Sequence, residues 1–373
     1  MNPAKFIEEL RAAFGAGNWS SCLKLLECLR GSESCPAALK VVPFVEGGGV
    51  DALLDFLNSQ HNLDYEATSE AQSAYDSCVA ELRSIIVEHP TFAQDGVDHQ
   101  LLKTLNNICQ HRPFTDAIFT NVAEISLTLS GGVASSPQSR AMFRETREKI
   151  ANCGVAQSLL RQLQSSLESP SPGLPYDTNS VPPFIVPTLR FLRNFARDPP
   201  HRPVLVDLGV LHVLPMALAS PTHQSPPGGC LLGDEAAVVA IEVLINLACA
   251  KPIKSKIVET SSTLDMLLEY AVPPTSLVLQ EVALSCLGLL SFNCATAVAQ
   301  LLNREVLAAL SFSIQSLRVS CERGEDCAGA ALSASTDLMK NLAQTTVGRR
   351  RLSSPTEVPL VDELIYIMTL AQV

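Results

Sequence analysis

The polar residues with the most regular spacing lie near the ends of predicted helices. Three segments share the order Leu or Met, any residue, Asn, an apolar residue and Ala, and a fourth has Ser in the Asn position. These positions are Asn194, Asn246, Ser291 and Asn341, separated by 52, 45 and 50 residues. Amide side chains carry donors and an acceptor, so such a series could pair the backbone of a bound peptide without reading its sequence. The alternative is that each Asn bonds within its own helix or to a neighbouring repeat.

Three arginines flank the first of these positions. Arg190, Arg193 and Arg197 are spaced i, i+3 and i+7, which places them on one helix face beside Asn194. Because the chain has a formal net charge of −11, this stripe is the best local candidate for contact with an anion or an acidic peptide. A solvated face with salt bridges to nearby Glu or Asp is the alternative. The run 349–351 is expected to be a solvated turn.

The sequence shows no catalytic constellation. It contains no G-x-S-x-G, Walker loop, G-x-G-x-x-G or His-Glu-x-x-His motif. Among twelve cysteines, the pairs Cys22/Cys28 and Cys321/Cys327 have no CxxC motif and no His pair beside them, so we expect reduced thiols and neither metal nor cofactor. Most thiols are expected in the core, for example Cys249, Cys286 and Cys294. We therefore expect a protein that is not an enzyme.

Charge and hydropathy exclude further classes. The net charge of −11 disfavours nonspecific binding to nucleic acid or anionic membranes, which depends on clustered Lys and Arg. No stretch approaches 18 apolar residues, so no membrane span is expected. Residues 1–10 indicate an amphipathic helix rather than a signal peptide. The expected compartment is the cytoplasm or the nucleus.

The elements that would position the polar residues repeat along the chain. A small residue, an aliphatic one and then leucines at helical spacing recur from positions 49, 96, 154, 209, 263, 305 and 359. This is a repeat period with insertions, and repeats of this size bury their apolar faces only by stacking on their neighbours. The sequence therefore predicts an all-helical solenoid.

The order of a short helix, a Gly-Val-x-x-Leu-x-x-Leu helix and a Leu-x-Asn-Leu-Ala helix resembles armadillo repeats, most closely over 185–373. The resemblance implies a right-handed superhelix of about six or seven repeats in 41–373, after N-terminal capping helices in 1–40. In 40–165 the phrase at 105–109 mimics a third helix but lies in an expected second helix, so HEAT-type repeats or an irregular hybrid remain alternatives there. Loop insertions are expected at 130–139, 168–183 and 220–233, with Ser-Pro steps that could be phosphorylated.

The resemblance also implies a binding mode. In armadillo proteins the third helices line a concave groove, and their Asn side chains bond an extended peptide. Where peptide-binding members carry Trp four residues before the Asn, this chain has Arg190, Glu242, Leu287 and Asp337, which argues against a receptor for nuclear localisation signals. The predicted partner-binding residues are Arg190, Arg193, Asn194, Arg197, Glu242, Asn246, Ser291, Asp337 and Asn341.

The predicted function is non-catalytic protein recognition, as a scaffold or adaptor that binds an extended or acidic partner segment. The alternative is a regulator, similar to an exchange factor, of a small GTPase or an Hsp70-type chaperone. A last helix is expected at 358–371, and self-association through its apolar residues is a further prediction.

Overall fold

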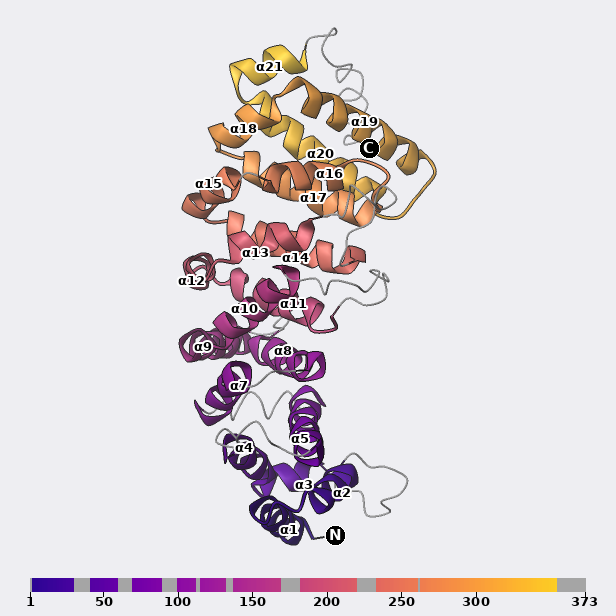
Figure 1. Cartoon of the computed structure of the whole chain (residues 1–373). Coiled ribbons are helices and arrows are strands. Elements are labelled where there is room, and N and C mark those ends of the chain that lie inside the picture. The colour runs from indigo at the N-terminus through magenta and orange to yellow at the C-terminus, as the bar shows by residue number, and fades with distance from the viewer. Residues whose placement is uncertain are drawn as a thin grey trace. The chain divides into compact units, whose positions relative to one another are not determined.

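The computed structural model describes residues 2–29, 41–59, 69–88, 99–111, 115–131, 137–168, 182–219, 233–260 and 262–353 (Figure 1). All regular elements in these ranges are α-helices, which confirms the all-helical prediction there. The helix expected at 358–371, the Ser-Pro steps and most of the expected insertions lie outside the described residues. The insertion expected at 130–139 is shorter than predicted, because helices occupy Ser130 and residues from Pro137 onward.

The chain forms two compact units, which are described in turn. The first contains Met1–Gln162 and Pro182–Asn194, and the second contains Leu163–Val181 and Phe195–Val373. Among the described helices, none combines the length and apolar character needed to cross a membrane.

The first unit stacks its helices in two series. One series is α1 (Pro3–Gly15), α4 (Gly49–Ser59) and α7 (His99–His111), and the other is α2 (Trp19–Leu29), α5 (Ser69–Glu88) and α8 (Asp116–Ser130). The phrase at 105–109 lies in α7, which packs on α4. The unit also contains α3 (Val41–Glu46), α9 (Pro137–Cys153), most of α10 (Val155–Glu168) and most of α11 (Ile185–Arg197).

The two N-terminal helices form the first layer of this unit. They are short, and α1 packs on α4 while α2 packs on α5. Phe14 stacks on Phe56 with ring centroids 3.9 Å apart, and Trp19 lies 6.0 Å from the same ring. These aromatic contacts cover the apolar side of α4, which would otherwise face water.

The second unit repeats a three-helix order. The short first helices are α12 (His201–Asp207), α15 (Lys251–Glu259), α18 (Ala295–Leu301) and α21 (Thr346–Leu352). The second helices are α13 (Val210–Leu218), α16 (Thr263–Ala271) and α19 (Arg304–Glu322), and the third are α14 (Gly233–Ala248), α17 (Leu277–Ser291) and α20 (Ala328–Ala343). Second helices pack on second helices and third on third. This like-on-like packing is consistent with a helical repeat array.

Short breaks separate the first and second helices. Gly209 precedes α13 with φ of 93°, a left-handed conformation that glycine adopts without a steric penalty. Asn303 precedes α19, and its side chain accepts a hydrogen bond from the backbone N–H of Glu305. Both residues end one helix and start the next within a few positions, which turns the chain back onto the stack.

Hydroxyl groups link successive second helices. Tyr270 Oη of α16 donates to the carbonyl O of Leu218, the last residue of α13, at 2.8 Å. Ser313 Oγ of α19 donates to the carbonyl O of Ala271, the last residue of α16, at 2.5 Å. Each bond satisfies a helix-end carbonyl that has no partner within its own helix. The stacking of the second helices is therefore fixed by polar contacts as well as by apolar burial.

Candidate protein-binding surface

The third helices of the second unit pack side by side. Helix α17 lies against α14 and α20 and is backed by α16. Close approach to α20 is permitted by Gly288, where an added β-carbon would lie 3.6 Å from the backbone N of Leu338. Helix α18 also contacts α17, and the accessible residues that remain mark the side that a partner could reach.

The predicted Asn position of α20 is used inside the protein. Asn341 Nδ2 donates to the carbonyl O of Gly288 at 2.8 Å and to Ser291 Oγ at 3.3 Å. Ser291 is buried, and its hydroxyl donates in turn to the carbonyl O of Gly288 at 2.8 Å. The two residues at equivalent positions of α17 and α20 therefore bond each other, which is the neighbouring-repeat interpretation.

The first unit contains the same pair. Asn194 Nδ2 donates to Ser130 Oγ of α8 at 3.3 Å, and Ser130 Oγ donates to the carbonyl O of Leu127 at 2.8 Å. Asn194 is only 2% exposed, so the prediction that it lies open to a peptide needs correction. Sequence reasoning missed Ser130 because the residue two places before it is Thr rather than Leu or Met. The sequence feature that could have identified it is a Ser at the last position of the helix, where Ser291 also stands in place of Asn.

The remaining predicted partner-binding residues differ in accessibility. Asp337 is exposed on α20, while Glu242 and Asn246 on α14 are half-buried and interact with other groups of the chain. On α11, Arg190 and Arg197 are exposed and Arg193 is half-buried. All three arginines also interact with other groups of the chain. Binding of a partner by these residues remains a prediction.

An exposed apolar stripe runs along α17. The accessible residues that recur at helical spacing are Val278, Val282, Ser285, Leu289 and Phe292. We call this set the open face of α17. The two ends of this stripe are the most accessible, with Val278 45% and Phe292 47% exposed. Phe312 and Val319 of α19 are similarly exposed, at 56% and 43%, but the α17 stripe also has the partly exposed Val282 and Leu289 between its ends. A longer apolar line of this kind is typical of an interaction surface.

Phe292 is held in place by a buried lysine. Lys254 of α15 is 7% exposed, and its Nζ donates to the carbonyl O of Leu289 at 2.7 Å and of Phe292 at 2.9 Å. The same ammonium lies 5.6 Å from the centroid of the Phe292 ring, within range of a cation–π contact. Burial lowers the pKa of Lys254. The lysine caps the last carbonyls of α17 and orients the aromatic ring at that end.

This cap belongs to a pattern that sequence reasoning missed. A basic residue stands eight positions after each of three Asn positions, at Arg202, Lys254 and Arg349, while Ala299 follows Ser291 at the same distance. Arg202 donates to the carbonyl O of Ala196 at 2.8 Å, and Arg349 donates to that of Gln344 at 3.0 Å, so both cap the third helix that precedes them. Lys254 instead caps α17 of the next repeat, whose own position holds Ala299. The regular spacing from Asn to the basic residue was the available signal.

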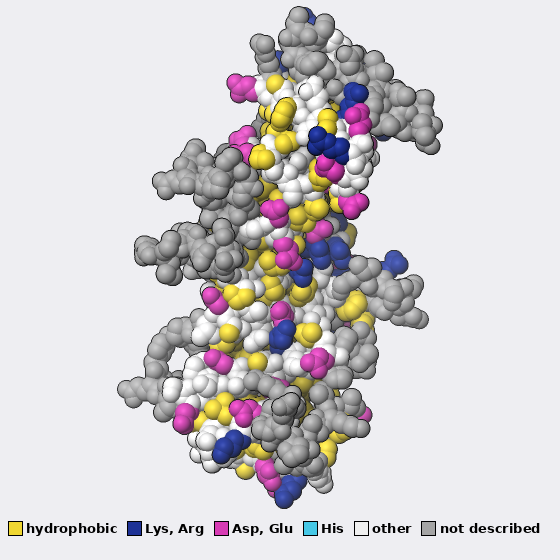
Figure 2. Space-filling model, turned by 90° about the vertical axis from the view of Figure 1, so that its right-hand side faces the viewer, with side chains coloured by type: hydrophobic (Ala, Val, Ile, Leu, Met, Phe, Trp, Pro, Cys, Tyr) yellow, Lys and Arg dark blue, Asp and Glu magenta, His cyan; other side chains and the backbone are white. Residues whose placement is uncertain are grey.

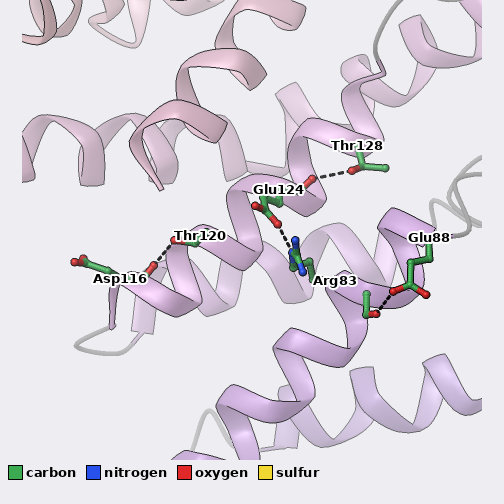
Figure 3. Close-up of polar contacts among 7 residues, drawn as sticks. Arg83, Glu88, Asp116, Thr120, Glu124 and Thr128 are labelled. Atoms are coloured by element: carbon green, nitrogen blue, oxygen red, sulfur yellow. Dashed lines mark hydrogen bonds and ion pairs between the residues drawn. The ribbon is translucent and has the colours of Figure 1, made fainter. Parts of the chain in front are cut away.

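In the first unit the neighbouring helices α5 and α8 are joined by an ion pair. Figure 3 shows Arg83 and Glu124 pointing toward one another, and Arg83 Nε donates to Glu124 Oε2. Both side chains remain partly accessible. Deeper in the unit, buried Arg147 of α9 donates to the carbonyl O of Ser130, the last residue of α8. Some polar groups on these helices therefore join neighbouring helices, while Ser84, Thr120 and Thr128 bond within their own helices.

The cysteines follow the core prediction in part. Cys286 and Cys294 are buried, as predicted, and burial raises the pKa of Cys286 to about 12. Cys249 is exposed, so its predicted place in the core was wrong. It follows the last residue of α14, Ala248, and its thiol donates to the carbonyl O of Ile245 at 3.4 Å. Within the described ranges, no cluster of three His, Cys, Asp or Glu residues could hold a metal ion.

The chain was also compared with known proteins. No protein-family model matches it, and no curated protein matches it in sequence.

Proposed function

We propose that this chain is a non-catalytic protein-binding scaffold or adaptor, built as an armadillo-like right-handed superhelix of about six or seven repeats. One observation carries the proposal. Helix α17 is covered by α14, α16 and α20, yet its fourth side exposes Val278 and Phe292. A stable monomer gains nothing from leaving such side chains in water, whereas a partner gains free energy by covering them.

The proposed surface extends from α17 onto its neighbours. Ser333, Asp337 and Lys340 are exposed on α20, and Glu242 is partly accessible on α14. A mixture of an apolar centre and a polar rim is the usual composition of protein–protein interfaces. Figure 2 shows apolar, acidic and basic side chains intermingled over the face that it presents, so interspersed charge alone does not mark the binding site.

The arginine stripe of α11 remains a second proposed contact, for an acidic segment. Arg190 and Arg197 supply exposed guanidinium groups, which bind carboxylates in a bidentate manner. The cytoplasm or nucleus is the proposed compartment, because recognition of this kind needs no disulfide or membrane anchor.

Differential co-purification tests the proposal. The intact chain and a Ser285→Arg/Ser333→Arg variant would be purified from the source cells, and bound proteins would be quantified by mass spectrometry. Both serines are exposed, so the substitutions obstruct the surface without disturbing the core. The matched control is Gln300→Arg/Gln315→Arg, which places the same charges on exposed positions of α18 and α19.

We expect some proteins to co-purify with both the wild type and the control. The amount of these proteins bound to the surface variant should be at least tenfold lower. Identical protein sets for all three chains would contradict the proposal. A nucleotide-release assay on any retained GTPase or Hsp70-type chaperone separates the alternative function, because a regulator accelerates release and a scaffold does not.

A further inference from the structure

We infer that the open face of α17 binds the apolar side of an amphipathic helix that carries basic residues beside its apolar stripe. This inference rests on the proposed function and names the chemistry of the partner at the same surface. It is carried by the shape of the apolar stripe, by the charges that border it and by the hydrogen bonds that the third helices have already made.

The stripe has the periodicity and length of a helix contact. Val278, Val282 and Leu289 share one side of α17 with Ser285, and Phe292 follows at the C-cap. The stripe therefore spans about 20 Å at 1.5 Å per residue. A partner helix of about four turns would cover this length with side chains at i, i+3, i+4 and i+7. A shorter contact would leave either Val278 or Phe292 exposed.

Hydrogen bonding favours a helical partner over an extended one. An extended peptide needs donors and acceptors for its own backbone, and the Asn side chains of the third helices were the predicted source. Asn341 Nδ2 is already engaged by Gly288 and Ser291, and the accessible positions of α17 are mostly apolar. A helix satisfies its own backbone groups and needs only an apolar surface.

The border of the stripe is acidic. Glu281 lies on α17 itself, Glu242 on the neighbouring helix α14 and Asp337 on α20. The basic residues nearby are exposed Lys340 on α20 and buried Lys254 at the Phe292 end. Facing charges of opposite sign speed association and exclude partners of the wrong sign. Basic flanks on the partner helix therefore complement the border, whereas an anionic membrane surface would be repelled by it.

Phe292 is the expected anchor of the contact. Its carbonyl and ring are both held by Lys254, so little freedom remains to be lost when a partner covers the ring. Aromatic side chains that are fixed before binding contribute most of the affinity in many interfaces.

Fluorescence anisotropy with defined peptides tests the inference on the full chain. The probe is an 18-residue helical peptide with a leucine stripe flanked by lysines. One control peptide has Glu in place of each Lys, and a second has the same composition with the leucines scrambled. We expect the first peptide to bind at least tenfold more tightly than either control.

Two matched double variants locate the site. Val278→Ser/Phe292→Ser should weaken binding of the Leu/Lys peptide at least tenfold. Val319→Ser/Phe312→Ser removes side chains of similar exposure, 43% and 56%, from α19 and should leave binding unchanged. All four positions are exposed, and unchanged thermal melting would show that each variant folds. Equal affinity for the three peptides, or equal loss in both double variants, would overturn the inference.

The border charges give an independent readout. Glu281→Lys/Asp337→Lys should weaken the Leu/Lys peptide and strengthen its Glu counterpart, while Glu305→Lys/Glu322→Lys on α19 should change neither. If Ser285→Arg/Ser333→Arg releases cellular partners but the peptides show no preference, the helix inference fails and the scaffold proposal stands. If that variant releases nothing, the scaffold proposal itself fails.

Discussion

Asn341 of α20 donates a hydrogen bond to Ser291 of α17, so the two residues at equivalent positions of neighbouring third helices bond each other. Asn194 and Ser130 form the same bond in the first unit, also at 3.3 Å. The same geometry recurs at two separate places in the chain. This recurrence indicates that the Asn–Ser pair fixes the register between neighbouring helices. Its first role in this chain is therefore structural.

Replacing Asn341 tests that role. Asn341→Ala removes two hydrogen bonds between α17 and α20 and should lower the free energy of unfolding by about 1–2 kcal/mol. Chemical denaturation followed by circular dichroism measures the change. The neighbouring exposed residue provides a control, since Lys340→Ala should shift stability by no more than about 0.5 kcal/mol. Equal stability of the two variants would argue against a structural role.

Lys254 should matter more than its neighbour on the same helix. Lys254→Met keeps most of the side-chain volume but leaves the carbonyl groups of Leu289 and Phe292 without their donor, which should cost about 1–3 kcal/mol. Lys251→Met changes an exposed residue of α15 and should have little effect. Thermal or chemical denaturation compares the two, and a harmless Lys254→Met would show that water replaces the lysine at the end of α17.

The close approach of α17 and α20 at Gly288 should make two substitutions there change the free energy of unfolding in opposite directions. A β-carbon there fits, with its nearest neighbour 3.6 Å away, so Gly288→Ala should be neutral or stabilising by about 0.5–1 kcal/mol through helix propensity. Gly288→Leu should destabilise by about 1–3 kcal/mol because the larger side chain has no space beside Leu338. Unfolding curves of both variants check the sign. A destabilising alanine would mean that the helices lie closer than described.

Cysteine labelling distinguishes the buried from the exposed thiols. Burial raises the pKa of Cys286 to about 12, so at pH 7 it remains a protonated thiol without access to reagent. Iodoacetamide should modify exposed Cys249 and Cys327 in the native chain and reach Cys286 only after unfolding. Peptide mass spectrometry identifies the sites. Modification of Cys286 at the rate of Cys249 would contradict the burial of α17 against its neighbours.

Periodicity predicted the fold better than it predicted the site. The recurring leucines placed α4, α13 and α16 within a residue or two of their observed starts, because burial of one helix face leaves a strong pattern in sequence. The same pattern could not say whether Asn194 faces a neighbour or a partner, since both uses need an amide at the same helix position. The open face of α17 was missed for a related reason. Val278, Val282 and Leu289 read as core residues in a helix that is apolar on nearly every side, and only the packing of α14, α16 and α20 shows which side stays open.

Site-specific photo-crosslinking in the source cells tests the central claim most directly. A benzoylphenylalanine would replace either Ser285 on the open face of α17 or Gln315, an exposed residue of α19. The account predicts that Ser285 yields discrete crosslinked partners at several times the level of Gln315. Equal yields, or a higher yield at Gln315, would contradict the claim that the third helices carry the binding surface.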